Sequence, residues 1–224
     1  MATQTTAQPA ATTGSGYRAG RAEGASFDRF AGMCAILGGV AGLLYSVAFV
    51  IIARTSPDLG VTLYSLFLLL GGVLNTAVLV ALYHRLRATS QPFAMWGVAL
   101  GVAAAVGSII HGGYDLANAI NPPANANLDL PSQVDPRGLL TFGVAGISVF
   151  VLSWLITRNG DFPKALGYLG YVVAVMLLII YIGRLVILDA TNPAIVVPAL
   201  LTGFLLNPAW YIGIGLVLLR RERP

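Results

Sequence analysis

The sequence predicts an all-α integral membrane protein, a six-transmembrane-helix bundle built from repeated helical hairpins. Of its 224 residues, 57% are hydrophobic and only 10% are charged. A soluble domain carries about 25% charged residues, so this chain has too few to cover a water-facing surface. The composition therefore argues against a disordered chain, a disulfide scaffold and a soluble enzyme of ordinary make-up.

Six apolar stretches follow a polar tail. Residues 1–26 are rich in Ala, Thr, Gln and Gly, cannot bury an apolar face, and are expected to form a flexible cytoplasmic tail. Each stretch approaches the roughly 20 residues that cross a hydrocarbon core, and none alternates like a barrel strand, so each is expected to be a helix. Within the transmembrane domain, 27–224, the expected spans are about 30–52, 61–83, 93–119, 139–157, 165–188 and 195–219.

Charge asymmetry orients the predicted bundle. Six spans place both termini on one side, together with the loops at 83–91 and 158–164. Ten of the 13 Lys and Arg residues fall on that side, whereas the other side holds only Arg54 and Arg137. Because positive charge accumulates on the cytoplasmic side, we expect a multi-pass protein of the cell inner membrane with both termini in the cytoplasm. The lipid bilayer is then the expected partner, and the net charge of +4 requires no nucleic acid.

Two hairpins of the predicted bundle resemble each other. The pattern F-x-[RK]-x-x-G opens the first span at 27–32 and the fifth span at 162–167. The pattern L-L-x-G-x-x-L-N occurs in the second span at 68–75 and in the sixth at 200–207. Both copies run in the same direction, which predicts parallel repeated hairpins with the middle hairpin as a diverged copy.

Polar side chains inside hydrocarbon are costly, so they are the first candidates for a functional site. The expected ligand-binding residues are His111, Tyr114, Asp115, Asn118, Tyr181 and Arg184. The four in the third span share one helical face, since they are spaced i, i+3, i+4 and i+7. At 1.5 Å per residue, Asp115 and Arg184 reach a matching height in the outer part of the membrane.

An ion pair between Asp115 and Arg184 is therefore expected, because an unpaired charge at this depth is costly. The functional interpretation places these polar residues around a small-molecule ligand. The structural alternative is a clamp that fixes the register of two helices, and a third is that Arg184 extends to the outer surface.

Proline marks an expected interruption of the sixth span. Asn207 and Pro208 fall near its middle, where proline frees a backbone carbonyl and favours a helix kink. Interrupted helices occur at binding sites of transporters, although most proline kinks only shape a helix.

Two G-x-x-x-G motifs provide small-residue surfaces for helix contact. They comprise Gly38, Gly42, Gly97 and Gly101. Such motifs allow two helices to approach closely. The contact is expected either inside the bundle or with a membrane-protein partner or a second copy of the chain.

Few side chains are suited to covalent or metal chemistry. The single cysteine, Cys34, has no partner for a disulfide. His84 and His111 lie at opposite ends of adjacent expected spans, which argues against paired haem ligands, and His111 with Asp115 provides too few ligands for zinc. No nucleophile motif or phosphate-binding loop is present. We therefore expect no catalytic residue, metal or cofactor, with His111 beside Asp115 as the one route left open to catalysis.

The 27–32 opening, the stretch HGGYDLAN at 111–118 and the six-span layout resemble a group of small bacterial six-span membrane proteins that form a domain of unknown function. This resemblance implies a topology and no activity. The sequence thus favours a small-molecule binding, sensing or transport module with a polar site in the outer half of the bundle. The alternative is a non-catalytic accessory or structural subunit of a larger membrane complex.

Overall fold

The computed structural model describes residues 14–122, 136–187 and 192–220, and these residues form helices without any strand. Six helical segments are long and apolar enough to cross a membrane, which confirms the predicted fold class. They are Ser26–Thr55, Pro57–Leu86, Gln91–Ile120, Leu139–Arg158, Lys164–Ile187 and Pro193–Leu219. Of the expected N-terminal tail, 1–26, residues 1–13 lie outside the described residues, whereas residues 14–26 belong to a helix that continues into the first span.

Several spans change helix type along their length. The α-helices are α1 (Gly14–Val47), α2 (Ala53–Thr55), α3 (Pro57–Leu86), α4 (Gln91–Ile120), α5 (Pro136–Gly138), α6 (Ala145–Arg158), α7 (Lys164–Ile187), α8 (Pro193–Leu201) and α9 (Asn207–Leu219). Short π-helical segments interrupt the first, fourth and sixth spans. They are η1 (Ala48–Ile52), η3 (Leu139–Val144) and η4 (Thr202–Leu206).

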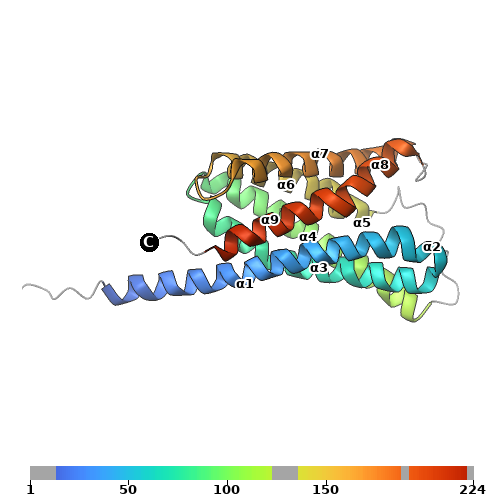
Figure 1. Cartoon of the computed structure of the whole chain (residues 1–224), viewed down its shortest axis with the longest axis horizontal. Helices are drawn as coiled ribbons and strands as arrows, with labels where there is room; N and C mark the ends of the chain where they lie inside the picture. The colour runs from blue at the N-terminus through green and yellow to red at the C-terminus, as the bar shows by residue number, and fades with distance from the viewer. Residues whose placement is uncertain (1–13, 123–135, 188–191, 221–224) are drawn as a thin grey trace, which may run out of the picture.

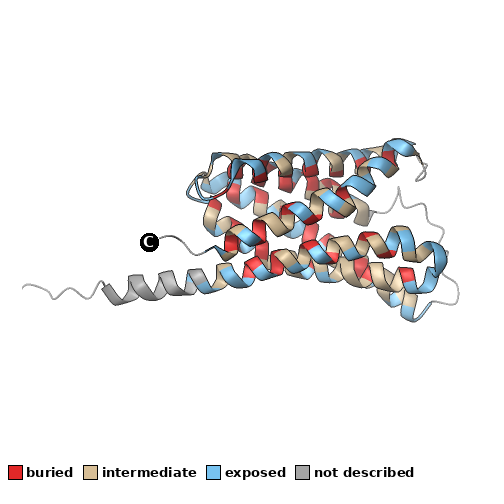
Figure 2. Ribbon diagram, viewed as in Figure 1, coloured by how far each residue is buried: buried red, intermediate tan, exposed pale blue. Residues whose placement is uncertain are grey.

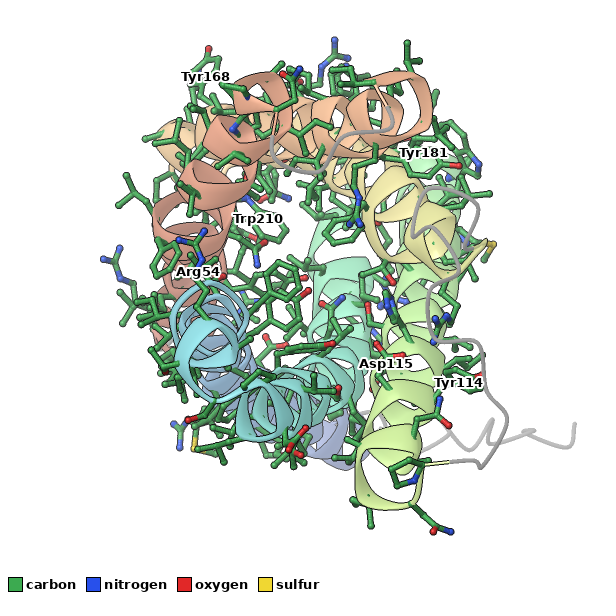
Figure 3. The ribbon with its side chains drawn as sticks, turned by 90° about the vertical axis from the view of Figure 1, so that its right-hand side faces the viewer. Arg54, Tyr114, Asp115, Tyr168, Tyr181 and Trp210 are labelled. Atoms are coloured by element: carbon green, nitrogen blue, oxygen red, sulfur yellow. The ribbon has the colours of Figure 1, made fainter. Side chains whose placement is uncertain are left out.

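The six spans form a closed ring. Each packs against the next along the chain: α1 against α3, α3 against α4, α4 against α6, α6 against α7, and α7 against α8 and α9. The ring closes where α9 packs against α1, as the view along the bundle shows (Figure 3). The membrane part of α1 begins, and α9 ends, at the same end of the bundle, called here the terminal end (Figure 1). The opposite end, where α2 meets α3, is called the distal end.

The half of the bundle nearer the terminal end is solidly packed (Figure 2). Its buried core includes Leu82, Leu86, Leu155, Ile156, Ile214 and Leu218, each at most 2% exposed. Close helix contact depends on glycine here, because a Cβ on Gly215 would lie 2.6 Å from the carbonyl oxygen of Gly32. Small residues of this kind allow tight contact between helices in lipid, where no hydrophobic effect draws them together.

Polar contacts close the terminal end. Arg85 Nε donates to a carboxylate oxygen of Asp28 at 2.7 Å, which joins the second span to the first. Asn159 Nδ2 donates to the carbonyl oxygen of Arg85 and to the hydroxyl of Thr89, at 3.2 and 3.1 Å. The guanidinium of Arg158 lies over the Trp154 ring, 4.0 Å from its centroid.

The G-x-x-x-G motifs face the interior of the ring. Ser148 donates its hydroxyl to the carbonyl oxygen of Gly97 at 2.7 Å. A Cβ on Gly101 would lie 2.5 Å from Leu79, and one on Gly42 would lie 3.3 Å from the amide nitrogen of Asn207. Gly38 faces Leu74. These contacts fit the internal-packing interpretation, and a contact with another chain stays a prediction.

Candidate functional site

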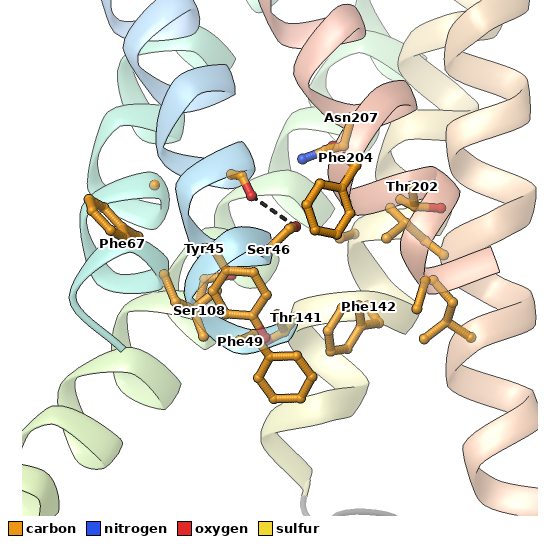
Figure 4. Close-up of a pocket in the computed structure, with 18 of the residues that line it drawn as sticks. Tyr45, Ser46, Phe49, Phe67, Ser108, Thr141, Phe142, Thr202, Phe204 and Asn207 are labelled. Atoms are coloured by element: carbon orange, nitrogen blue, oxygen red, sulfur yellow. Dashed lines mark hydrogen bonds between the residues drawn. The ribbon is translucent and has the colours of Figure 1, made fainter. Parts of the chain in front are cut away.

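The ring surrounds a cavity of about 570 Å³ to which all six spans contribute (Figure 4). Its walls are mostly apolar, with a limited set of polar side chains. The polar and charged lining consists of Tyr45, Ser46, Arg54, Asn75, Ser108, Thr141, Arg184, Thr202, Asn207 and Tyr211. This volume and composition are typical of pockets that bind small molecules.

The cavity extends from the distal end toward the middle of the bundle. Arg54 lies in α2 and Arg184 in the last turn of α7, both at the distal end. Twelve residues separate Arg54 from Gly42, which corresponds to roughly 18 Å along the span. Trp210, only 2% exposed, lies with Leu79 and Leu82 around a small void that adjoins the deep side of the cavity. The buried terminal core therefore continues directly from the floor of the cavity.

The three π-helical segments all contribute to the cavity wall. They supply Phe49 and Val50 from η1, Thr141 and Phe142 from η3, and Thr202, Gly203 and Phe204 from η4. A π-helical turn holds an extra residue, which redirects the side chains on either side of it, and such turns are frequent at functional sites. The expected interruption at Asn207 and Pro208 coincides with the junction between η4 and α9.

A cluster of aromatic rings supports one side of the cavity, which Tyr45 and Phe49 line. Tyr45 and Phe49 stack with their ring centroids 5.9 Å apart. Tyr64 of α3 meets the edges of both rings, at 6.0 and 5.3 Å. This cluster joins the first two spans and gives the cavity a firm apolar wall, because paired aromatic rings hold each other's orientation.

Several polar atoms in the cavity make no hydrogen bond within the described part of the chain. The hydroxyl of Thr202 is buried and has no partner. The carboxamides of Asn75 and Asn207 also line the cavity without a hydrogen-bond partner among the described residues. By contrast, Ser46 and Ser108 each donate to a carbonyl one turn earlier in their own helix, both at 3.1 Å. For the buried hydroxyl of Thr202 the missing hydrogen bond costs about 1–3 kcal/mol, which a bound molecule that hydrogen-bonds it would offset.

The repeated L-L-x-G-x-x-L-N pattern coincides with two walls of this cavity. The lining includes Leu68, Gly71 and Asn75 from the first copy and Leu200, Gly203 and Asn207 from the second. The two copies thus present the same three residue types to one space. This repeat is the sequence signal that could have identified these six cavity residues.

The predicted ion pair between Asp115 and Arg184 is wrong. A carboxylate oxygen of Asp115 accepts from Arg137 Nη1 at 2.9 Å, and the other lies 3.4 Å from His111 Nε2. The physical reason is the order of helices in the ring: α4 packs against α3 and α6, whereas α7 packs against α6, α8 and α9. Matching height does not bring the two side chains into contact, because α6 lies between α4 and α7 in the ring.

The predicted six-residue site is therefore divided. Among those residues only Arg184 lines the cavity. His111, Tyr114 and Asp115 form a separate distal cluster with Arg137, whose guanidinium lies 4.6 Å from the centroid of the Tyr114 ring (Figure 3). Asn118 is half-buried on α4, and Tyr181 lies beside Gly143 of η3.

The distal cluster borders the cavity through one contact. His111 Nδ1 lies 3.5 Å from the hydroxyl oxygen of Thr141, which lines the cavity. The cluster joins α4 to α5 and η3. It therefore has the geometry of the predicted structural clamp, but its arginine is Arg137 and not the expected Arg184. The described residues contain no group of three His, Cys, Asp or Glu side chains that could hold a metal ion.

Comparison of the chain with protein-family models, with curated proteins and with solved structures finds no match. The length and hydropathy of its six helices define it as a multi-pass membrane protein. Beyond that class, a functional assignment depends on the cavity itself.

Proposed function

We propose that this protein binds a small molecule in the central cavity, as a binding, sensing or transport module of the cell inner membrane. The observation that carries the proposal is a cavity shared by all six spans in which Asn75, Asn207 and Thr202 have no hydrogen-bond partner among the described residues. Polar groups without partners are uncommon in packed interiors, and in a cavity they provide attachment points for a ligand.

The alternative, an accessory subunit of a larger complex, would use glycine-rich faces and the basic tail as contact surfaces. The four motif glycines contact neighbouring helices of the bundle, so they do not favour that alternative. It remains an outcome of the experiment below, where a protein rather than a small molecule would accompany the chain.

Gly71 offers a way to fill the cavity without strain. It lines the cavity, and a Cβ built on it meets nothing within 4 Å. Gly71→Leu therefore places a branched side chain into the open space. The matched control is Ala103→Leu, an exposed position of α4 that does not line the cavity.

The test is native mass spectrometry of the protein released from nanodiscs that were formed directly from cell membranes. We expect a small molecule bound to the wild type and to Ala103→Leu, and its loss in Gly71→Leu. Equal retention by all three chains would contradict binding in the cavity. A stoichiometric protein partner without a small molecule would favour the accessory-subunit function.

The proposal includes an orientation in which the terminal end faces the cytoplasm and the cavity opens toward the outer side. The positive-charge asymmetry supports it. In a Cys34→Ala background, a cysteine is placed at Ser56, exposed at the distal end, or at Ala88, exposed at the terminal end. A membrane-impermeant thiol reagent should label Ser56→Cys in intact cells and Ala88→Cys only after the cells are opened. The reverse pattern would show that the cavity faces the cytoplasm.

A further inference from the structure

We infer that the ligand of this cavity is an anionic amphiphile, with its acidic group at the distal arginines and its apolar body along the aromatic wall. This inference rests on the proposed binding function and names the chemical class of the ligand. The observation behind it is that charged, apolar and neutral polar side chains occupy three successive regions along the cavity.

Positive charge is confined to one end of the cavity. Arg54 and Arg184 line it at the distal end, and its described lining contains no aspartate or glutamate. Within the described residues, Arg54 forms no ion pair with an acidic side chain. A cationic ligand would be repelled at this end, whereas a carboxylate or phosphate would form charge-assisted hydrogen bonds with guanidinium groups.

The surface between the distal arginines and the deep end is apolar and aromatic. Phe49, Phe142 and Phe204 line the cavity, and Phe204 lies next to Asn207 at the end away from Phe49 (Figure 4). An extended apolar chain would replace water along these rings, and that exchange favours binding in proportion to the apolar area buried.

The polar side chains at the deep end of the cavity are neutral. Asn207 lies next to Gly42, roughly 18 Å from Arg54 along the first span, and Asn75 is on the facing helix α3. Both carboxamides are neutral, so they suit a terminal hydroxyl, carbonyl or bound water. The cavity therefore fits an elongated molecule with one acidic end.

The test uses four probes that share a twelve-carbon chain: dodecanoate, dodecyl phosphate, dodecanol and dodecylammonium. Their binding to the wild-type chain in nanodiscs of zwitterionic lipid is measured by native mass spectrometry, with empty nanodiscs as the blank. We expect both anions to bind at least about tenfold more tightly than dodecanol, because charge-assisted hydrogen bonds are the stronger kind. We expect dodecylammonium to bind most weakly. Equal affinity for dodecanoate and dodecanol would overturn the inference without needing any variant.

Substitution of the two distal arginines tests whether the acidic group of the ligand binds there. Arg54→Gln and Arg184→Gln should each lower dodecanoate affinity about tenfold and leave dodecanol affinity unchanged. Arg54→Lys, which keeps the charge, should retain most of the anion preference. The control is Arg87→Gln, an exposed arginine at the terminal end, which removes the same charge far from the cavity. An anion preference that survives both cavity substitutions, or that Arg87→Gln lowers equally, would overturn the assignment.

A second lipid composition of the nanodiscs distinguishes two possible sources of the anionic group, a membrane phospholipid and a free acid. If membrane phospholipid occupies the site, nanodiscs that contain anionic phospholipid should lower apparent dodecanoate affinity in the wild type and not in Arg54→Gln. If a free acid is the ligand, the affinity should stay unchanged; both results leave an anionic amphiphile as the ligand class.

Failure of this inference is distinguishable from failure of the proposed function. If dodecanol binds as well as dodecanoate and Gly71→Leu abolishes both, the cavity binds ligands but does not select an acid. If no probe binds and no small molecule accompanies the native protein, the binding function itself is wrong.

Discussion

The same six apolar spans form both halves of the bundle, but the two halves are packed in opposite ways. Near the terminal end, Leu86, Ile156 and Ile214 are fully buried, and glycine contacts hold α1 and α9 together. Toward the distal end, π-helical segments interrupt three of the six spans, and the ring opens into the cavity. The difference shows that hydropathy determines where the spans lie, while glycines and changes of helix type determine whether those spans close on one another.

The largest expected effect compares two glycines, one from each half. Gly215→Leu should prevent stable folding, because its Cβ would lie 2.6 Å from the backbone oxygen of Gly32, which has no room to yield. Overpacking of this kind costs about 3 kcal/mol or more. Gly71→Leu, which projects into the cavity, should leave stability nearly unchanged. Thermal unfolding in detergent, followed by size-exclusion chromatography, measures both, and equal losses would contradict the contrast between the two halves.

A second comparison removes apolar contacts instead of adding bulk. Ile214→Ala, at a fully buried position of the terminal half, should lower the free energy of unfolding by about 2–5 kcal/mol. Leu200→Ala, on the partly exposed cavity wall, should cost less than half as much, since its side chain has fewer neighbours to lose. Chemical denaturation of the two variants in the same detergent provides the measurement. A larger loss at Leu200 would indicate that the distal half is packed as tightly as the terminal half.

The ion pairs at the distal end give a smaller expected effect, and they test which arginine is coupled to Asp115. Asp115→Asn should destabilise the chain by about 1–3 kcal/mol, because Arg137 loses its charged partner at 2.9 Å. The double variant with Arg137→Gln should lose less than the sum of the single variants, whereas Asp115→Asn combined with Arg184→Gln should be additive. Coupling of Asp115 to Arg184 in place of Arg137 would restore the original prediction.

The spans were predictable because each depends on a local property, a run of apolar residues long enough to cross a bilayer. The expected first span, 30–52, lies within the observed Ser26–Thr55, and the expected fourth span, 139–157, differs from Leu139–Arg158 by one residue. Both termini of the bundle therefore fall at one end, as six crossings require. The compartment that this end faces stays a prediction.

The site was harder to predict because sequence position gives depth in the membrane but not the rotation of a helix within the ring. Sequence position predicts a similar depth for Asp115 and Arg184, and the order of helices separates them. In the sequence Arg137 is only a charge near the outer surface, whereas in the structure it lies in α5, just before η3, and pairs with Asp115. The repeated asparagines offered a better guide, since Asn75 and Asn207 occupy equivalent places in two copies and both line the cavity.

The smallest expected effect compares a satisfied hydroxyl with an unsatisfied one. Ser148 is buried and donates to Gly97 at 2.7 Å, so Ser148→Ala should cost about 1 kcal/mol through the lost hydrogen bond. Thr202 is also buried but has no hydrogen-bond partner among the described residues, so the isosteric Thr202→Val should be neutral or stabilising by up to about 1 kcal/mol. Thermal unfolding is measured before and after delipidation, and these values are expected after it. If Thr202→Val destabilises the chain before delipidation only, the lost partner is a bound molecule, and the hydroxyl then belongs to the binding site. If Thr202→Val destabilises the delipidated chain, the hydroxyl has a partner within the protein.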